Sequence, residues 1–244
     1  MTIFNPKAQV IENFFSDDEI FEVEKRFREF SDVDIQVESH GVYMSDSTER
    51  KSVPARSHYW YPGPSMGNWL NDYCNAKIRE RFGQEIQCWN WHILNAFKPY
   101  GVHSDSYDEL DPEATRIHED QDYAWTFLIP LADYDAHTFV FNEWSDFVKA
   151  PGVWAKRTGH QPVYEIDDEM YEKHFTHEKR EIIDLFSIDT QFHWKKGNLL
   201  AMSRHSFHSS CNFPENGLFE KRALIGWSTT GNIEDTLAHE HIRT

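Results

Sequence analysis

The sequence predicts a mainly β fold whose helices are gathered in the N-terminal part of the chain. Residues 1–85 carry helical periodicity and capping signals, whereas short apolar runs bounded by turn residues dominate from residue 86 onward. Helices followed by a run of strands are typical of an antiparallel barrel or sandwich braced by helices. The 244 residues contain no repeat or Gly/Ser-rich linker, so we expect a single domain, 1–244, with barrel strands within 86–142 and 190–230.

Two helices are expected before the strands. Ser16-Asp17-Asp18-Glu19 forms a capping box, in which the Ser and Glu side chains each satisfy a free backbone N–H. Apolar residues then repeat at helical spacing, namely Ile20, Val23, Phe27 and Phe30. A second helix is predicted from Ser65 to Phe82, and Gly83 is a plausible C-terminal stop.

Five apolar or alternating runs predict the strands of the barrel. They are Ile86 to Lys98, Tyr123 to Leu131, His137 to Phe141, Gly197 to Met202 and Arg222 to Thr229. The segment 143–189 interrupts them, and its charged stretch from Asp167 to His177 is expected to be helical with a solvated face. An insertion of this length in a compact barrel is a candidate lid.

Composition restricts the partners. The formal net charge of −17 and the lack of a basic patch argue against nucleic acid and anionic membrane surfaces. No apolar run approaches the ~20 residues of a membrane span, and no signal peptide is evident. Three scattered cysteines fit reduced thiols in a cytoplasmic protein. We therefore expect a small-molecule or peptidyl substrate, and the oligomeric state stays open.

His103-Ser104-Asp105 is the most informative motif. On an extended strand, residues two apart point the same way, so an imidazole and a carboxylate would share one face. A second His would complete the 2-His-1-carboxylate set that binds non-haem Fe(II). Pro214 to Gly217 predicts a hairpin turn that would set His208 opposite Ala223, beside Arg222. An Arg fork there could bind the far carboxylate of a 2-oxo acid.

Several segments together resemble the Fe(II)/2-oxoglutarate-dependent dioxygenases, whose fold is a double-stranded β-helix, the jelly-roll also found in cupins. The segments are VIENFFSDDEIFEVEKRF, NAFKPYGVHSDSYDEL, FLIPLADYDAHTFVF, KKGNLLAMSRHSFHSS and KRALIGWSTT. The resemblance implies iron ligands His103, Asp105 and His208. It further implies that Arg222 grips the C5 carboxylate of 2-oxoglutarate and that Asn95 hydrogen-bonds this co-substrate.

The resemblance also implies the cofactors and the outcome. Fe(II), 2-oxoglutarate and O2 would together hydroxylate a C–H bond, and Asp105 stands where halogenating members have Gly or Ala. Two departures concern the co-substrate: the Arg222-Ala223-Leu224 run lacks the Ser of the R-x-S pattern, and Phe97 stands where some members have a Tyr donor.

Alternatives accompany each assignment. His103 and Asp105 could belong to a loop, His118-Glu119-Asp120 spells the same pattern, and His205 rivals His208. Arg222 could be a structural ion-pair partner, and Asn95 a hydrogen-bonded strand amide. The competing functions are a cupin-like metalloprotein with isomerase or hydrolase chemistry, and a jelly-roll binding module without metal.

Overall fold

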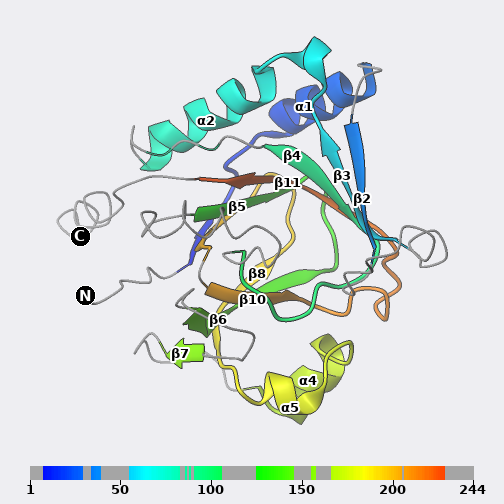
Figure 1. Cartoon of the computed structure of the whole chain (residues 1–244), viewed down its shortest axis with the longest axis vertical. Helices are drawn as coiled ribbons and strands as arrows, with labels where there is room; N and C mark the ends of the chain where they lie inside the picture. Colours follow the sequence, from blue (N-terminus) through cyan, green and yellow to red (C-terminus); the bar gives the residue numbers. More distant parts are fainter. Residues whose placement is uncertain are drawn as a thin grey trace, which may run out of the picture.

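A computed structural model describes residues 8–29, 34–39, 55–82, 86, 88, 91–105, 125–145, 155–157, 166–204 and 206–228. Two antiparallel sheets lie face to face at the centre of this structure, and Figure 1 shows helices beyond both of them. The chain is therefore mainly β, as the sequence predicts, and the arrangement is consistent with a jelly-roll.

The major sheet has seven strands in the order β1-β9-β5-β11-β4-β3-β2. Their bounds are β1 Gln9–Ile11, β2 Asp34–Ser39, β3 Ala55–Tyr61, β4 His92–Ala96, β5 Trp125–Pro130, β9 Leu199–Ser203 and β11 Lys221–Trp227. In the minor sheet β6 pairs with β10 on one side and with β7 and β8 on the other. Their bounds are β6 His137–Ser145, β7 Ala155–Arg157, β8 Ile188–His193 and β10 Ser206–Ser210.

Helices α1 (Asp17–Glu29) and α2 (Trp69–Phe82) pack on the outer face of the major sheet (Figure 1). A 3-10 turn, η2 (Pro64–Met66), precedes α2. The apolar residues between helices and sheet include Val23, Ile78 and Leu224. Neighbours of Leu224 on β11, Ala223 and Ile225, belong instead to the core between the two sheets. Successive residues of β11 thus serve opposite faces of the sheet, and both faces are buried.

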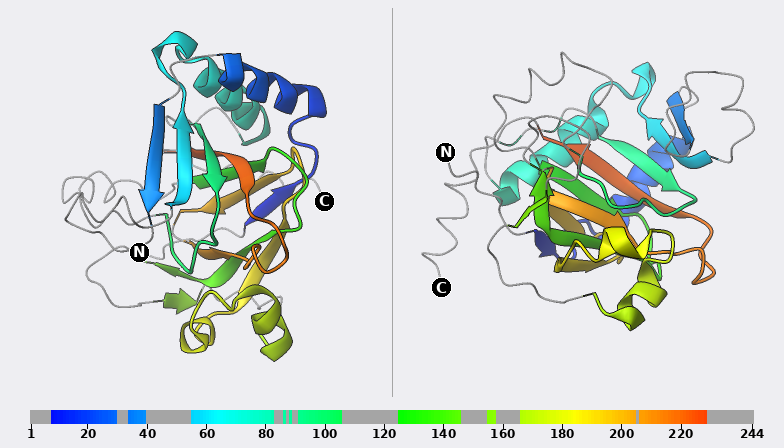
Figure 2. Two further views of the ribbon diagram at one scale, coloured as in Figure 1. Left: turned by 90° about the vertical axis from the view of Figure 1, so that its right-hand side faces the viewer. Right: turned by 60° about the horizontal axis from the view of Figure 1, so that its bottom comes forward.

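The outer face of the minor sheet is covered by α4 (Asp168–His174) and α5 (Arg180–Ile183), which Figure 2 shows at the end opposite α1 and α2. Phe175 packs on Phe139 of β6, with ring centroids 4.7 Å apart. Burial of His174 and Phe175 shows that the predicted helix around Asp167 does not present only a solvated face. Within the described residues, no helix is both long and apolar enough to cross a membrane.

Local signals of the sequence predicted several elements correctly. The capping box at α1 is present, since the Ser16 N–H donates to Glu19 Oε2 (2.8 Å) and the Glu19 N–H to Ser16 Oγ (3.3 Å). The predicted strand from Ile86 is shorter than expected, because regular pairing of β4 covers only His92–Ala96. Phe30, Gly83 and Trp89 lie outside the described residues.

The hairpin predicted around Glu215 is wrong. β10 pairs with β6 in the minor sheet, whereas β11 pairs with β4 and β5 in the major sheet. The connection between β10 and β11 begins with three buried residues, Cys211, Asn212 and Phe213, which anchor it before it turns. The chain therefore passes from the minor sheet to the major sheet here. Pro214 to Gly217 forms a turn within this connection and does not join two paired strands.

Gly197, directly before β9, is expected to tolerate no side chain. Its φ is +73°, and a Cβ there would lie 2.1 Å from the Phe15 carbonyl oxygen. The Phe15 N–H donates to the Gly197 carbonyl (2.9 Å), which holds the loop before α1 against Gly197. Gly197→Ala is therefore expected to lower the free energy of unfolding by at least ~2 kcal/mol, measured by urea denaturation. Gly217→Ala is the control, because its φ is +80° but nothing lies within 4 Å, so only ~1 kcal/mol of backbone strain is expected. Equal losses in the two variants would contradict the steric explanation.

Candidate metal centre and its cavity

His103 and His208 are brought together by the main chain. The His103 N–H donates to the His208 carbonyl (3.0 Å), and the His208 N–H donates back to the His103 carbonyl (2.8 Å). This two-residue bridge attaches the loop after β4 to β10, so His103 lies on an isolated bridge and not on the predicted strand. The two imidazole rings consequently face each other with centroids 4.2 Å apart.

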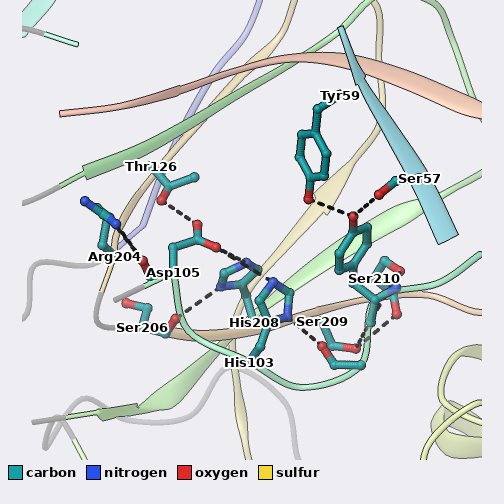
Figure 3. A network of polar contacts seen from close by, with 12 residues as sticks. Ser57, Tyr59, His103, Asp105, Thr126, Arg204, Ser206, His208, Ser209 and Ser210 are labelled. Atoms are coloured by element: carbon teal, nitrogen blue, oxygen red, sulfur yellow. Dashed lines mark hydrogen bonds and ion pairs between the residues drawn. The ribbon is translucent and has the colours of Figure 1, made fainter. Parts of the chain in front are cut away.

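Asp105 completes a compact group with these two histidines (Figure 3). Its Oδ1 lies 3.8 Å from His103 Nε2 and 3.7 Å from His208 Nε2. Thr126 of β5 donates to Asp105 Oδ2 at 2.5 Å, and Arg204 donates to the Asp105 carbonyl through Nε and Nη2. Side chains from the major sheet thus orient the Asp105 carboxylate toward the two histidines. Asp105 lies in a turn, whereas the sequence predicted an extended strand at this position.

The protonation of the site suits a cation. Nδ1 of His103 lies 2.7 Å from the Gly101 carbonyl, and Nδ1 of His208 lies 3.2 Å from the Ser206 carbonyl. A carbonyl only accepts, so each Nδ1 is the donor, and each Nε2 is the ring nitrogen that lies near Asp105 Oδ1. Burial, followed by repulsion from His103, lowers the pKa of His208 to about 4, so this imidazole is neutral at pH 7.

The carboxylate of Asp105 stays ionised. Burial alone would raise its pKa, but the neighbouring His208 and His103 and the hydrogen bond from Thr126 outweigh burial and lower it. Ligand atoms of two imidazoles and one carboxylate therefore lie within 4.8 Å of one another. His103, Asp105 and His208 form a donor set that matches the 2-His-1-carboxylate arrangement of non-haem iron.

A cavity between the two sheets opens from this group of residues. The space between its walls, including the part open to solvent, is ≈ 570 Å³. The triad lines one part of the wall, and most of the remainder is apolar or aromatic. The other lining residues are Tyr59, Leu94, Ala96, Tyr100, Thr126, Leu128, Thr138, Trp194, Met202, Ser210, Lys221, Ile225 and Trp227.

Lys221 is the cation of this cavity. Its side chain is 1% exposed, and its Nζ has no hydrogen-bond partner among the described residues. The ammonium lies over the Trp194 ring, 3.9 Å from the centroid, and 4.7 Å from the Phe213 centroid. Burial lowers the pKa of Lys221 to about 8. A buried ammonium without a carboxylate partner is energetically costly, so an anionic ligand would find a prepared partner here.

Comparisons with known proteins agree with this architecture. The epimerase SnoN from nogalamycin biosynthesis, crystallised with Fe3+, alpha ketoglutarate and nogalamycin RO, aligns over 93% of this chain and 79% of its own, with a TM-score of 0.51 and 11% identity. An oxidoreductase of the 2OG-Fe(II) oxygenase family from Burkholderia pseudomallei aligns over 91% and 85%, with a TM-score of 0.50 and 12% identity. The chain has the fold of the Fe(II)/2-oxoglutarate-dependent oxygenases. No family model and no curated protein matches the sequence.

Within this oxygenase fold, Arg222 lies on the face of β11 that is turned away from the cavity. Its Nη1 donates to Glu24 Oε1 of α1 at 2.9 Å, and its guanidinium lies 5.1 Å from the Trp60 ring centroid. The structure therefore gives Arg222 the ion-pair contact that was the alternative to a co-substrate role. Asn95 is likewise absent from the cavity wall, because it faces the same side of β4 as Ile93, under the helices.

Sequence reasoning assigned no role to several polar residues that line this cavity, among them Lys221, Tyr59 and Tyr100. Lys221 stands directly before Arg222, and Tyr100 lies in the segment that leads to His103. The Tyr59 and Tyr100 hydroxyls lie 2.9 Å apart, and Ser57 Oγ also contacts the Tyr100 hydroxyl (Figure 3). The rival candidates His118, Glu119, Asp120 and His205 lie outside the described residues.

Proposed function

We propose that the protein is an oxidoreductase that couples oxidative decarboxylation of 2-oxoglutarate to hydroxylation, or a related C–H oxidation, of a second substrate. One observation supports the proposal most directly: the same cavity wall contains a His/Asp/His group and an unpaired, buried ammonium. A cupin-like site for isomerisation or hydrolysis needs the first feature but not the second. The SnoN complex contains Fe3+ and alpha ketoglutarate in a protein of similar fold.

In this proposal His103, Asp105 and His208 hold Fe(II). The donor set fits this ion, because two imidazole nitrogens and one carboxylate oxygen are ligands that Fe(II) accepts while leaving positions open. When bound, the metal supplies the redox chemistry with O2 that protein side chains lack. The hydrogen bonds to Gly101, Ser206 and Thr126 orient the three ligands before the metal arrives.

Lys221 takes the part that the sequence resemblance assigned to Arg222. Its ammonium would pair with the C5 carboxylate of 2-oxoglutarate, and the Tyr100 and Tyr59 hydroxyls are the nearby donors for the remaining carboxylate oxygens. Trp194 would shield this contact from water, since it packs on the ammonium and its Nε1 donates to Thr138 Oγ1 (2.9 Å). Exclusion of water strengthens an ion pair in such a pocket.

The second substrate is proposed to be a small molecule or a peptidyl side chain. The net charge of the protein, −17, supports this choice because it disfavours binding of nucleic acid and anionic membranes. A cytoplasmic location is proposed as well, since all three cysteines are free thiols in the structure.

An anaerobic titration tests the proposal. Addition of Fe(II) and 2-oxoglutarate to the wild type is expected to produce a visible metal-to-ligand charge-transfer band, and O2 should then yield succinate. His208→Ala is expected to abolish both signals, because it removes one of three ligands. His58→Ala is the matched control, since this β3 imidazole makes an edge-to-face contact with Phe97 outside the cavity and should leave both signals intact.

A wild type with neither band nor succinate would contradict the oxygenase proposal, and metal binding without succinate formation would favour the cupin-like alternative. A band that survives in His208→Ala but disappears in His205→Ala would move the distal ligand to His205.

A further inference from the structure

A second group of metal-ligating side chains lies behind the minor sheet. His137, His174 and Cys211 each present a ligand atom, and these atoms all lie within 4.8 Å of one another. His137 begins β6, His174 ends α4, and Cys211 follows β10. Thr138 and Ser210 line the cavity, so the residues beside them, His137 and Cys211, are expected on the opposite side of the sheet. The group is therefore separate from the triad.

Two ring nitrogens of this group are buried without a hydrogen-bond partner among the described residues. They are Nδ1 of His174, a residue that is 3% exposed, and Nδ1 of His137. A buried ring nitrogen left without a partner costs free energy that native structures normally avoid. Two such nitrogens beside one buried thiol are explained together if a cation accepts lone pairs from all three residues.

The Cys211 sulfur is buried and lies against the backbone at the start of β6. Cys211 is 0% exposed, and its Sγ accepts a hydrogen bond from the His137 backbone N–H at 3.1 Å. A second backbone bond, from the Cys211 N–H to the His137 carbonyl (3.0 Å), fixes the two residues against each other. Burial raises the pKa of the Cys211 thiol, although the charge of Lys221 and the His137 backbone N–H act in the opposite direction. A bound metal would therefore supply the remaining stabilisation of the thiolate, which is the form that binds metal.

We propose that His137, His174 and Cys211 form a Zn²⁺ site, with the fourth tetrahedral position left to water. Imidazole and thiolate are the ligands that zinc prefers, and a thiolate disfavours Mg²⁺ and Ca²⁺. The stacked ring of His193, 4.7 Å from the His137 centroid, shields one side of the site. This site shares no ligand with the triad, so it can be tested apart from the function proposed above, although Cys211 and Lys221 interact electrostatically.

The zinc ion would hold α4 against the minor sheet and thereby brace the loop that leads to His103. Residues that follow His174 contact this loop: His177 Nε2 lies 3.3 Å from the Tyr100 carbonyl, and Glu178 Oε1 accepts from the Val102 N–H at 2.9 Å. The Asn212 N–H also donates to the His174 carbonyl (2.8 Å), next to Cys211. Zinc would thus act as a structural clip behind the first predicted iron ligand.

Cobalt substitution tests the site, because thiolate coordination has its own optical signature. In an Asp105→Ala/His208→Ala background, whose triad is disabled, one equivalent of Co²⁺ is expected to give a sulfur-to-cobalt charge-transfer band and intense tetrahedral d–d bands. Zinc should displace the cobalt and raise the melting temperature. Cys211→Ser and His174→Gln in that background should lose the charge-transfer band and the zinc-dependent rise, whereas Cys74→Ser, which alters a buried thiol elsewhere, should keep both.

X-ray absorption of the zinc-loaded background protein provides a readout that needs no ligand variant. One sulfur scatterer at about 2.3 Å together with imidazole scatterers is expected. The absence of a sulfur scatterer, or a charge-transfer band that persists in Cys211→Ser, would overturn the assignment.

Discussion

Lys221→Met is expected to weaken 2-oxoglutarate binding while making the ligand-free protein more stable. Loss of a buried, charge-paired partner typically costs ~2–5 kcal/mol of binding free energy, so the Kd should rise about 30-fold or more. The ligand-free protein should gain about 1–3 kcal/mol at pH 7, because Met fills the same buried position without a desolvated charge. Calorimetric titration and urea denaturation measure the two effects.

The control for this prediction is Arg222→Met. Its side chain contacts Glu24 outside the cavity, so 2-oxoglutarate affinity should change by less than about threefold. A loss of affinity confined to Arg222→Met, with Lys221→Met unchanged, would return the co-substrate role to Arg222.

The pH dependence of binding provides an independent readout of the same residue. The folded pKa of Lys221, about 8, is below its ordinary value. The ammonium is therefore charged below pH 8, and above it 2-oxoglutarate must bind together with a proton, so the Kd should rise up to about tenfold per pH unit. For the same reason the ligand-free wild type should become more stable as pH rises from about 8 toward the unfolded pKa. Lys221→Arg should flatten the binding profile, since a guanidinium stays charged.

Asp105→Ala is expected to remove Fe(II) binding and turnover together. The substitution leaves two imidazoles without an anionic ligand, while the Arg204 bonds to the residue 105 backbone carbonyl remain available. The loss of Fe(II) affinity should exceed the ~10–100-fold that is typical when only a residue behind a ligand is changed. Anaerobic Fe(II) titration with metal analysis of the desalted protein measures it.

Thr126→Val is the graded companion to this variant. Valine keeps the shape of this buried residue but cannot donate to Asp105 Oδ2, so Fe(II) affinity should fall only ~10–100-fold. Equal effects of Asp105→Ala and Thr126→Val would indicate that Asp105 serves the fold and not the metal.

The sequence predicted the class of fold and named the three residues that the structure brings together, because both depend on local signals. The capping box, the short apolar runs and the two His-containing motifs each lie within a few residues. What the sequence could not contain was the contact between His103 and His208, since that bridge joins a loop to a strand of the other sheet. His208 was predicted from a hairpin between β10 and β11, and these strands do not pair in the structure.

The choice between Lys221 and Arg222 was beyond the sequence for a physical reason. Adjacent residues on a strand face opposite sides, and one of two neighbouring cations must point into the cavity. Alternation usually reveals which one, but β11 is buried on both faces, with Ala223 and Ile225 on one side and Leu224 on the other. Arg222 faces the helices because it pairs with Glu24 of α1, a residue that is close in space but far away in the sequence.

The reciprocal backbone bonds between His103 and His208 have a consequence for how the protein acquires metal. Bringing His103 and His208 together from distant parts of the chain costs loop-closure entropy. The backbone hydrogen bonds between them form on folding, so this entropy is lost before a metal ion binds. Zinc fingers, by contrast, remain unfolded until metal closes the loop. The ligand-free chain is therefore expected to fold completely on its own, and nearly all of the intrinsic coordination energy can be expressed as affinity for the ion.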